Sequence, residues 1–207
     1  MNELEELASA LDVPLIGPTV SMLPLRREHA EGLLRAADPS LWRYSLAMPI
    51  ETKRDAEAFV AEAMSARASS REVPFAIVHN RDGSVVGTSR YMQIEPEYAS
   101  IEIGMTWIAS RYHGKGVNPA AKLLLLTHAM EVARVVRVEF QVDHRNERSR
   151  AALSKIGATY EGTLRRYHAH ARNGYERNTM VFSVIDLEWL HVRERLANIV
   201  RMSEEPA

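Results

Sequence analysis

Arg111-Tyr112-His113-Gly114-Lys115-Gly116-Val117-Asn118-Pro119 stands between a predicted strand and a predicted helix. Before it, apolar residues alternate with polar or small ones over 99–108, which is the period of a half-buried strand. After it, 118–134 is rich in Ala and Leu and predicts a helix, with Asn118 as N-cap and Pro119 at the first helical position. The two glycines let backbone N–H groups from about His113 to Asn118 point toward one spot at the positive end of that helix. The segment therefore predicts a cradle for an anion such as a pyrophosphate.

A Gly-x-Gly run alone also fits an ordinary turn between a strand and a helix. The third glycine of a dinucleotide-binding fingerprint would fall at Pro119, and the sequence lacks repeated strand–helix units. Both observations argue against a nucleotide-dependent oxidoreductase. The sequence also contains no Gly-x-x-x-x-Gly-Lys-Ser/Thr run of the kind that binds nucleoside triphosphates.

Several spaced segments together resemble one known family. Residues 111–116 resemble the Arg/Gln-x-x-Gly-x-Gly/Ala signature of the GCN5-related N-acetyltransferases (GNAT), and 142–158 resemble the second cofactor motif of that family. Glu161-Gly162-Thr163-Leu164-Arg165 follows as in the RimJ/RimL branch, which acetylates ribosomal-protein N-termini. With the closing hairpin 175–185 and Glu188-Trp189, the resemblance covers about 18–189. It implies a mixed α/β (α+β) fold, in which a mostly antiparallel, twisted and splayed sheet of about six to seven strands is flanked by helices.

Periodicity and turn chemistry predict the remaining elements. A turn at Asn80-Arg81-Asp82-Gly83 indicates a hairpin, and Gly157 indicates the end of a short helix. The predicted helices are 2–11, 27–37, 52–67, 147–155 and, after Asp186 as a cap, 186–201. The predicted strands are 20–25, 73–79, 84–94, 136–142, 159–170 and 177–185. The last two flank a predicted turn at Arg172-Asn173-Gly174.

The bulk composition is that of an ordinary globular protein. The chain has 207 residues, 46% hydrophobic and 26% charged, and a formal net charge of −1. We expect a single acetyltransferase domain over 1–207, with 1–17 and about 190–207 as peripheral helical extensions. The absence of cysteine excludes disulfides and thiolate zinc sites, and we expect no metal. The charge pattern and the lack of signal or membrane segments predict a cytoplasmic protein without direct nucleic-acid or membrane partners.

The resemblance implies acetyl-CoA as co-substrate, held by three parts of the chain. The loop contributes backbone N–H groups, and its side chains Arg111 and Lys115 can assist the phosphates, although solvated loop charges are equally consistent. The preceding strand pairs with the pantetheine arm through Met105, Thr106 and Trp107, and one apparent extra residue predicts a β-bulge there. The implied cofactor-binding residues are Met105, Thr106, Trp107, Arg111, His113, Gly114, Lys115, Gly116, Val117, Asn118, Asn146 and Ser149.

Asn146 and Ser149 are three residues apart, so both can face one side at a helix start. The resemblance implies that Asn146 contacts the cofactor and that Ser149 lies near the sulfur and helps protonate the leaving thiolate. A purely structural role, with Asn146 as N-cap and Ser149 in the first turn, is compatible with both.

Two residues are candidates for the general base. His168 occupies the position at which the resembled branch carries a glutamate, and a neutral imidazole is a competent base near pH 7. Glu102 is the second candidate, since strand acids serve this role in other branches of the family. His168 and His170 can equally be half-exposed strand residues, and their spacing supplies only two of the ligands that a metal needs.

The acceptor is an amine, and physical chemistry narrows its class only slightly. Deprotonation at pH 7 costs about 1.1 kcal/mol for an α-amino group and about 4.6 kcal/mol for a lysine ammonium. This favours a protein N-terminal α-amine, while polyamines, amino acids and aminoglycosides stay open. A non-catalytic acyl-CoA-binding regulatory module is the alternative from another class, and a homodimer is compatible with the additional helices at both ends.

Overall fold

The computed structural model describes residues 2–168 and 177–204. Its helices are α1 (Glu3–Leu11), α2 (Ala30–Ala36), α3 (Lys53–Ala68), α4 (Val117–Thr127), α5 (Glu147–Ile156) and α6 (Asp186–Glu204). Its strands are β1 (Leu15–Ile16), β2 (Val20–Pro24), β3 (Val73–His79), β4 (Ser84–Glu95), β5 (Ser100–Ile108), β6 (Arg137–Asp143), β7 (Thr159–Leu164) and β8 (Thr179–Ile185). Short 3-10 turns and one π-helical turn (His128–Val132) join them.

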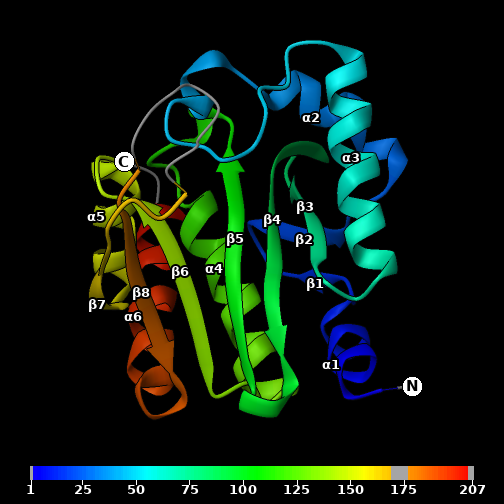
Figure 1. The fold of residues 1–207 in the computed structure, drawn as a ribbon. Helices are drawn as coiled ribbons and strands as arrows, with labels where there is room; N and C mark the ends of the chain where they lie inside the picture. The colour runs from blue at the N-terminus through cyan, green and yellow to red at the C-terminus, as the bar shows by residue number, and fades with distance from the viewer. Residues whose placement is uncertain (1, 169–176, 205–207) are drawn as a thin grey trace.

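In the described part of the chain, eight strands form one sheet in the order β1-β2-β3-β4-β5-β6-β8-β7 (Figure 1). Neighbours are antiparallel except β5 and β6, which are parallel. The predicted mixed α/β fold with a mostly antiparallel sheet is therefore confirmed. The strand number exceeds the expected six to seven because β1, a two-residue strand, adds to the edge at β2. A strand this short has no periodicity that a sequence pattern can reveal.

Local capping chemistry explains where several helices begin and end. The Asn2 side chain accepts from the Glu5 amide at the start of α1, and the Thr52 hydroxyl accepts from the Asp55 amide at the start of α3. Gly157 ends α5 with φ 94°, a left-handed conformation that favours glycine. These boundaries confirm the predicted ones to within a few residues.

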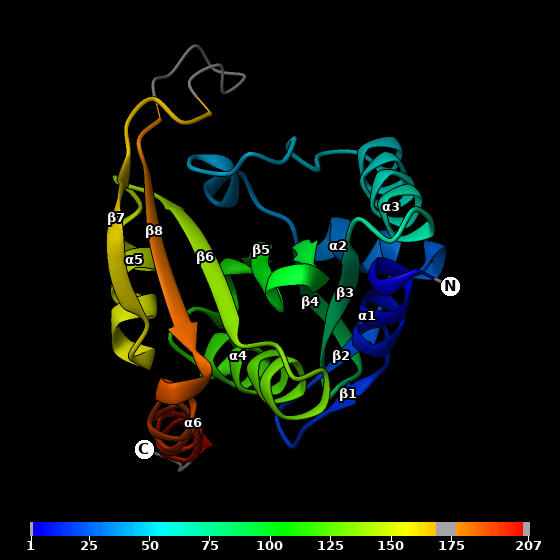
Figure 2. The same cartoon turned by 60° about the horizontal axis from the view of Figure 1, so that its bottom comes forward.

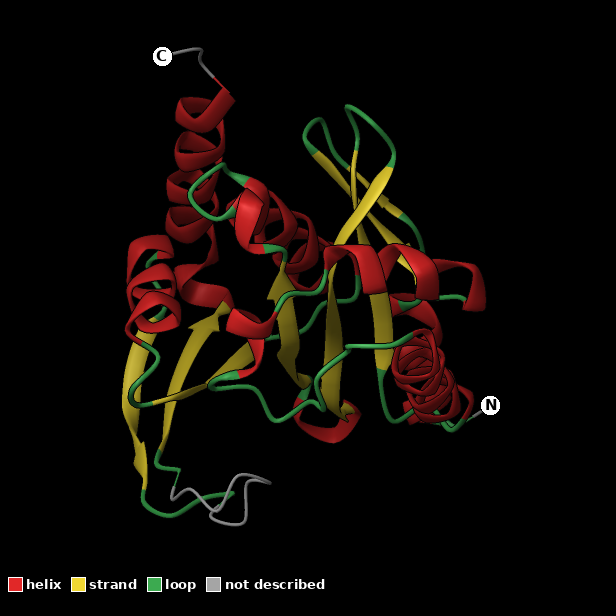
Figure 3. Ribbon diagram, turned by 90° about the horizontal axis from the view of Figure 1, so that it is seen from above, coloured by secondary structure: helices red, strands yellow, loops and turns green. Residues whose placement is uncertain are grey.

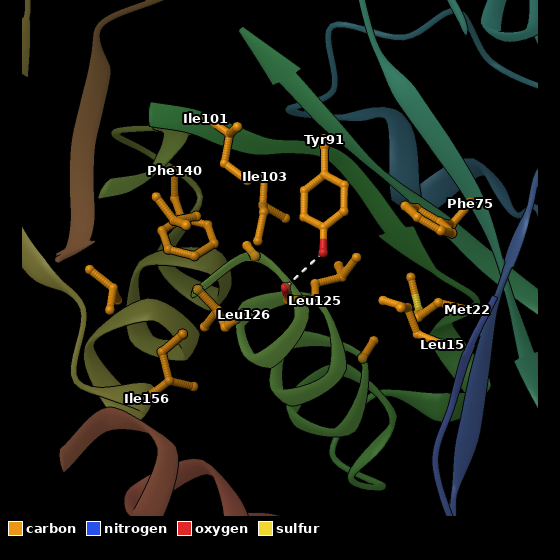
Figure 4. Packing of buried hydrophobic residues seen from close by; sticks show 14 of the residues in the cluster. Leu15, Met22, Phe75, Tyr91, Ile101, Ile103, Leu125, Leu126, Phe140 and Ile156 are labelled. Carbon is orange, nitrogen blue, oxygen red and sulfur yellow. Dashed lines mark hydrogen bonds between the residues drawn. The ribbon is translucent and has the colours of Figure 1, made fainter. Parts of the chain in front are cut away.

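Helices cover both faces of the sheet (Figures 2 and 3). Side chains of α2 and α3 form one buried cluster with one face, and those of α1, α4, α5 and α6 form the other cluster with the opposite face. In the second cluster, the buried Tyr91 hydroxyl donates to the Leu125 carbonyl at 2.7 Å, which ties β4 to α4 (Figure 4). The end helices, expected at the periphery, contribute to the core through Leu11 and Leu196, which have no exposed surface.

Two observed element boundaries differ from the predicted ones: the start of α4 and the end of β7. Helix α4 begins at Val117 with Gly116 as N-cap, so the prediction of Asn118 as N-cap was wrong. Gly116 adopts φ 78°, which lets the chain enter the helix one residue after the glycine; Pro119 still lies in the first turn, where its missing N–H is tolerated. The strand predicted over 159–170 ends at Leu164. The predicted turn at Arg172-Asn173-Gly174 lies outside the described residues.

Candidate functional site

The candidate site lies where strands β5 and β6 separate. They pair only from Ser100 and Arg137 to Glu102 and Glu139, and beyond this point they diverge (Figure 1). Side chains and backbone from β5, α4, α5 and the loop 41–47 enclose a cavity of about 440 Å³ at this fork. A cavity of this size suits a small molecule or a cofactor arm. Of the predicted site residues, the cavity is lined by Glu102, Met105, Thr106, Trp107, His113, Gly114, Gly116, Asn118, Asn146, Ser149 and His168.

The predicted bulge lies in β5. Thr88 of β4 pairs with Trp107 and Arg90 pairs with Gly104, so Met105 and Thr106 together face the single residue between Thr88 and Arg90. Met105 adopts φ 49°, which is unusual for a residue other than glycine. A bulge leaves its extra residue outside the strand ladder. Main-chain groups around Met105 are therefore available to a ligand that lies along the strand.

The glycine loop forms a narrower cradle than the sequence predicts. Gly114 adopts φ 75° and Gly116 φ 78°, but the amides of His113 and Lys115 donate to the carbonyls of Ser110 and Tyr112. The first helical bond runs from the Ala120 amide to the Gly116 carbonyl at 3.0 Å, and Gly116 as N-cap supplies no side-chain cap. The first-turn amides of α4 therefore keep the unsatisfied donors of a helix start, which suits an anion.

His113 holds an arginine beside this loop. Its Nε2 lies 2.8 Å from the Ile108 carbonyl oxygen, and its Nδ1 lies 2.7 Å from Nη1 of Arg148. Because a guanidinium only donates, Nδ1 accepts and Nε2 carries the proton, so this arrangement needs the neutral imidazole. Arg148 lines the cavity, and sequence reasoning missed it, although it lies between Asn146 and Ser149 in the second motif.

Three predicted cofactor residues do not line the cavity with their side chains. The Arg111 guanidinium lies over the Tyr112 ring, 5.2 Å from its centroid, and donates to the Arg35 carbonyl. Lys115 is exposed at the tip of the loop, and Val117 is buried in the core. Any contribution of Val117 to an anion site therefore comes from its amide.

Asn146 caps α5 as the structural interpretation predicts. Its Oδ1 accepts from the Ser149 amide at 3.1 Å. Both residues also line the cavity, so the cap and a contact with a ligand are compatible. The capping bond fixes the Asn146 side chain at the cavity wall.

Glu102 lies at the point where β5 and β6 separate. It is 8% exposed, and burial, reinforced by the negative charge of Glu139, raises its pKa to about 7, although Arg177 and Lys122 oppose the rise. A Cβ atom on Gly104 would lie 2.7 Å from Oε1 of Glu102, so the glycine leaves room for the carboxylate. A buried carboxyl with this pKa can exchange a proton near neutral pH.

Two buried cations that the sequence analysis did not single out accompany Glu102. Lys122 of α4 is 6% exposed, and burial lowers its pKa to about 7 while Glu102 opposes that change. Arg177 is 5% exposed and donates from Nε to the Thr179 hydroxyl at 2.9 Å. The signal for Lys122 was a single charge inside an otherwise apolar helix, whereas Arg177 reaches the cavity only through the topology of β8.

His168 lies in a turn after β7 and not in a strand, with φ 63°. It is exposed at the rim of the cavity, and its ring lies 4.2 Å from that of Tyr167. Partial burial and then the charge of Arg177 lower its pKa. The expectation of half-exposed strand residues is thus corrected for His168, and His170 lies outside the described residues.

The described residues contain no group of three or more His, Cys, Asp or Glu that could hold a metal ion. None of their helices combines the length and the apolar character that crossing a membrane requires.

Comparison with known proteins gives one consistent result. Residues 20–159 match the family model described as "Acetyltransferase (GNAT) domain". "Putative ribosomal N-acetyltransferase YdaF" of Bacillus subtilis (strain 168) is 33% identical over 108 residues, which are 52% of this chain and 57% of that protein. The alignment thus spans little more than half of that relative.

Solved structures match over most of the chain. A putative acetyltransferase from T. thermophilus is 35% identical with a TM-score of 0.80, and the match covers 89% of this chain and 95% of that one. Mycobacterium smegmatis RimJ in complex with CoA-disulfide is 25% identical with a TM-score of 0.75, over 89% of this chain and 92% of that one.

Proposed function

The chain belongs to the GNAT acetyltransferase family, and from this premise we propose that it transfers an acetyl group from acetyl-CoA to a protein N-terminal α-amine. One observation carries the proposal. The fork between β5 and β6 joins an uncapped helix start, at Gly116, to a buried carboxyl of raised pKa, at Glu102. Acetyl transfer needs both an anion site for the donor and a proton acceptor for the amine.

The residues present fit acetyl-CoA. The first-turn amides of α4 and the guanidinium of Arg148 would hold the diphosphate, and the bulged strand at Met105 would pair with the pantetheine arm. The cofactor supplies the thioester. Among similar structures, that of M. smegmatis RimJ contains coenzyme A as a disulfide, which supports this assignment.

The remaining roles belong to the side chains of the cavity. Glu102 would accept the proton of the amine, directly or through one water, because its pKa lies close to neutral. The backbone at the Met105 bulge would donate to the carbonyl oxygen as it gains charge. Ser149 would hydrogen-bond the leaving thiolate. His168, exposed at the rim of the same cavity, is the second candidate for the base.

The charge of the cavity favours a singly charged acceptor. Two acidic and four basic side chains line its described part: Glu102, Asp143, Lys122, Arg148, Lys155 and Arg177. Glu102 and Lys122, each with a pKa of about 7, are charged in about half of the molecules at pH 7, so the positive charges of the other side chains still exceed the negative one. Such a lining suits the phosphates of the donor and disfavours polyamines or aminoglycosides, which carry several positive charges. A peptide N-terminus brings one charge and an amine that loses its proton readily. The names of the relatives, which include a ribosomal N-acetyltransferase, agree with a protein acceptor.

The whole chain would act as one catalytic domain, because both end helices pack into the core. A cytoplasmic location would agree with the name of the relative described as a ribosomal N-acetyltransferase. Light scattering coupled to gel filtration would show whether it acts as a monomer or as a homodimer.

A thiol-release assay with acetyl-CoA tests the function, using N-terminal peptides, polyamines, amino acids and aminoglycosides as acceptors. We expect turnover of peptides, lost by about 10²-fold or more in Glu102→Gln and changed less in His168→Ala. Loss of the activity in His168→Ala with full activity in Glu102→Gln would assign the base to the histidine. Tight binding of acetyl-CoA without turnover of any amine would identify a non-catalytic acyl-CoA-binding module instead.

A further inference from the structure

Lys122 is a buried amine that lines the same cavity, and the proposed reaction gives it no role. Its Nζ lies 3.4 Å from the Thr106 hydroxyl and 4.8 Å from the centroid of the Phe140 ring. Within residues 2–168 and 177–204, no ion pair joins Lys122 to a carboxylate. Lysines are rarely buried without such a partner, because desolvation of the ammonium is expensive.

The consequence of burial is a neutral amine. Because the pKa of Lys122 falls to about 7, its amine is neutral and carries a free lone pair in about half of the molecules at pH 7. An exposed lysine does so in only roughly one molecule in 2,500. A neutral amine that lines a ligand cavity is a nucleophile.

Two features place Lys122 near the expected donor: its contact with Thr106 and its position on α4. Thr106 belongs to the bulge, and its hydroxyl is held 2.7 Å from that of Ser89. Lys122 itself lies on α4, five residues after Val117, at which the helix begins. A donor that runs from the start of α4 to the bulge therefore brings its thioester to the strand segment that Lys122 contacts.

We propose that Lys122 is a site of self-acetylation, at which its Nζ attacks the thioester carbonyl of bound acetyl-CoA when no acceptor amine is present. This inference rests on the proposed function. A C–N bond forms and the C–S bond breaks; the thiolate leaves as coenzyme A, and the proton of the attacking amine passes to the thiolate or to water. The product is an amide, which is not an activated acyl donor. The modification is therefore terminal, limited to one acetyl group per site, and it removes a positive charge from the cavity.

The chain contains its own controls. Its four lysines are Lys53, Lys115, Lys122 and Lys155. The other three are exposed; Lys155 lines the rim of the same cavity, and Lys53 lies on α3. Ordinary chemical acetylation in solution favours exposed amines, whereas reaction from a bound donor favours the amine held in the cavity.

The experiment incubates the full chain with acetyl-CoA carrying a ¹³C-labelled acetyl group and no acceptor, followed by intact mass measurement and peptide mapping. The isotope separates new acetylation from any acquired during expression. We expect one labelled acetyl group per chain, placed on Lys122 at least about tenfold faster than on the other lysines, because the bound donor has a high effective concentration there. The urea-unfolded chain should lose this preference. Lys122→Arg should remove the label, and Lys53→Arg, at an exposed position on α3 outside the cavity, should keep it.

The outcomes separate this inference from the proposed function. Turnover of peptides, or binding of acetyl-CoA, without label on Lys122 would overturn self-acetylation and leave the acetyltransferase assignment untouched. Equal labelling of Lys122 and Lys53 in the folded chain would also overturn it. Absence of acetyl-CoA binding in calorimetry would remove the proposed function, and self-acetylation with it.

Discussion

Replacing Glu102 by glutamine should stabilise the protein at alkaline pH. Burial raises the pKa of this carboxyl from 4.5 to about 7, so above pH 7 the folded protein holds a charge that the unfolded chain carries more easily. At about 1.4 kcal/mol per pKa unit, the difference corresponds to about 3 kcal/mol of lost stability. This loss of stability develops as the pH rises from the pKa of Glu102 in the unfolded chain to its pKa in the folded protein. Below the unfolded pKa the loss is absent. Glutamine has nearly the same shape and stays neutral, so the variant escapes the loss.

Urea unfolding of both proteins at about pH 4 and about pH 8 measures this difference. We expect Glu102→Gln to be more stable by about 3 kcal/mol at the higher pH and nearly equal to the parent at the lower. Glu97, an exposed residue in a turn, supplies the control, because Glu97→Gln should change stability at neither pH. A Glu102→Gln variant that is no more stable than the parent at about pH 8 would show that the carboxyl is not held at a cost, which refutes the reasoning.

Other substitutions test the loop and its surroundings. Gly114→Ala should lower the free energy of unfolding by about 1–2 kcal/mol through its left-handed backbone, and Gly116→Ala by more, because its Cβ would also lie 2.6 Å from Cβ of Ser203. If urea unfolding gave equal losses of unfolding free energy for the two glycine variants, the close packing of Gly116 against Ser203 would be contradicted. Arg148→Gln should weaken coenzyme A binding by about tenfold or more and reduce its salt dependence, since charge-assisted bonds to phosphate are strong. His113→Ala, which releases the Arg148 guanidinium, should have a smaller effect of the same kind; unchanged salt dependence in calorimetry would exclude Arg148 from the phosphate site.

Much of the fold could be predicted because short stretches determine it locally. A hydroxyl at Thr52 with an acid three residues later specifies a helix start, and Gly157 specifies a helix end. The bulge in β5 was also predictable, from one apparent extra residue in a matched motif. Strand β1 was not, because two residues carry no pattern and pair only when the rest of the sheet exists. The start of α4 at Val117 was not predicted, because Asn118 and Pro119 match the sequence pattern of a helix cap. The left-handed Gly116 acts as N-cap instead.

The site shows where a linear pattern stops being informative. The position of His168 was inferred by counting along a strand, but the chain leaves that strand at Leu164, so the count cannot place the imidazole. Glu102 looks like an ordinary alternating residue, yet it is the last paired residue before two strands diverge, and this topology buries it. Burial in turn raises its pKa toward neutrality, which is the property that a base needs. Lys122, on the helix beneath, shares the same cause, because the fork that desolvates one charge also desolvates the other. The chemistry of this site is therefore a property of the splayed sheet, and it requires long-range pairing that no local motif contains.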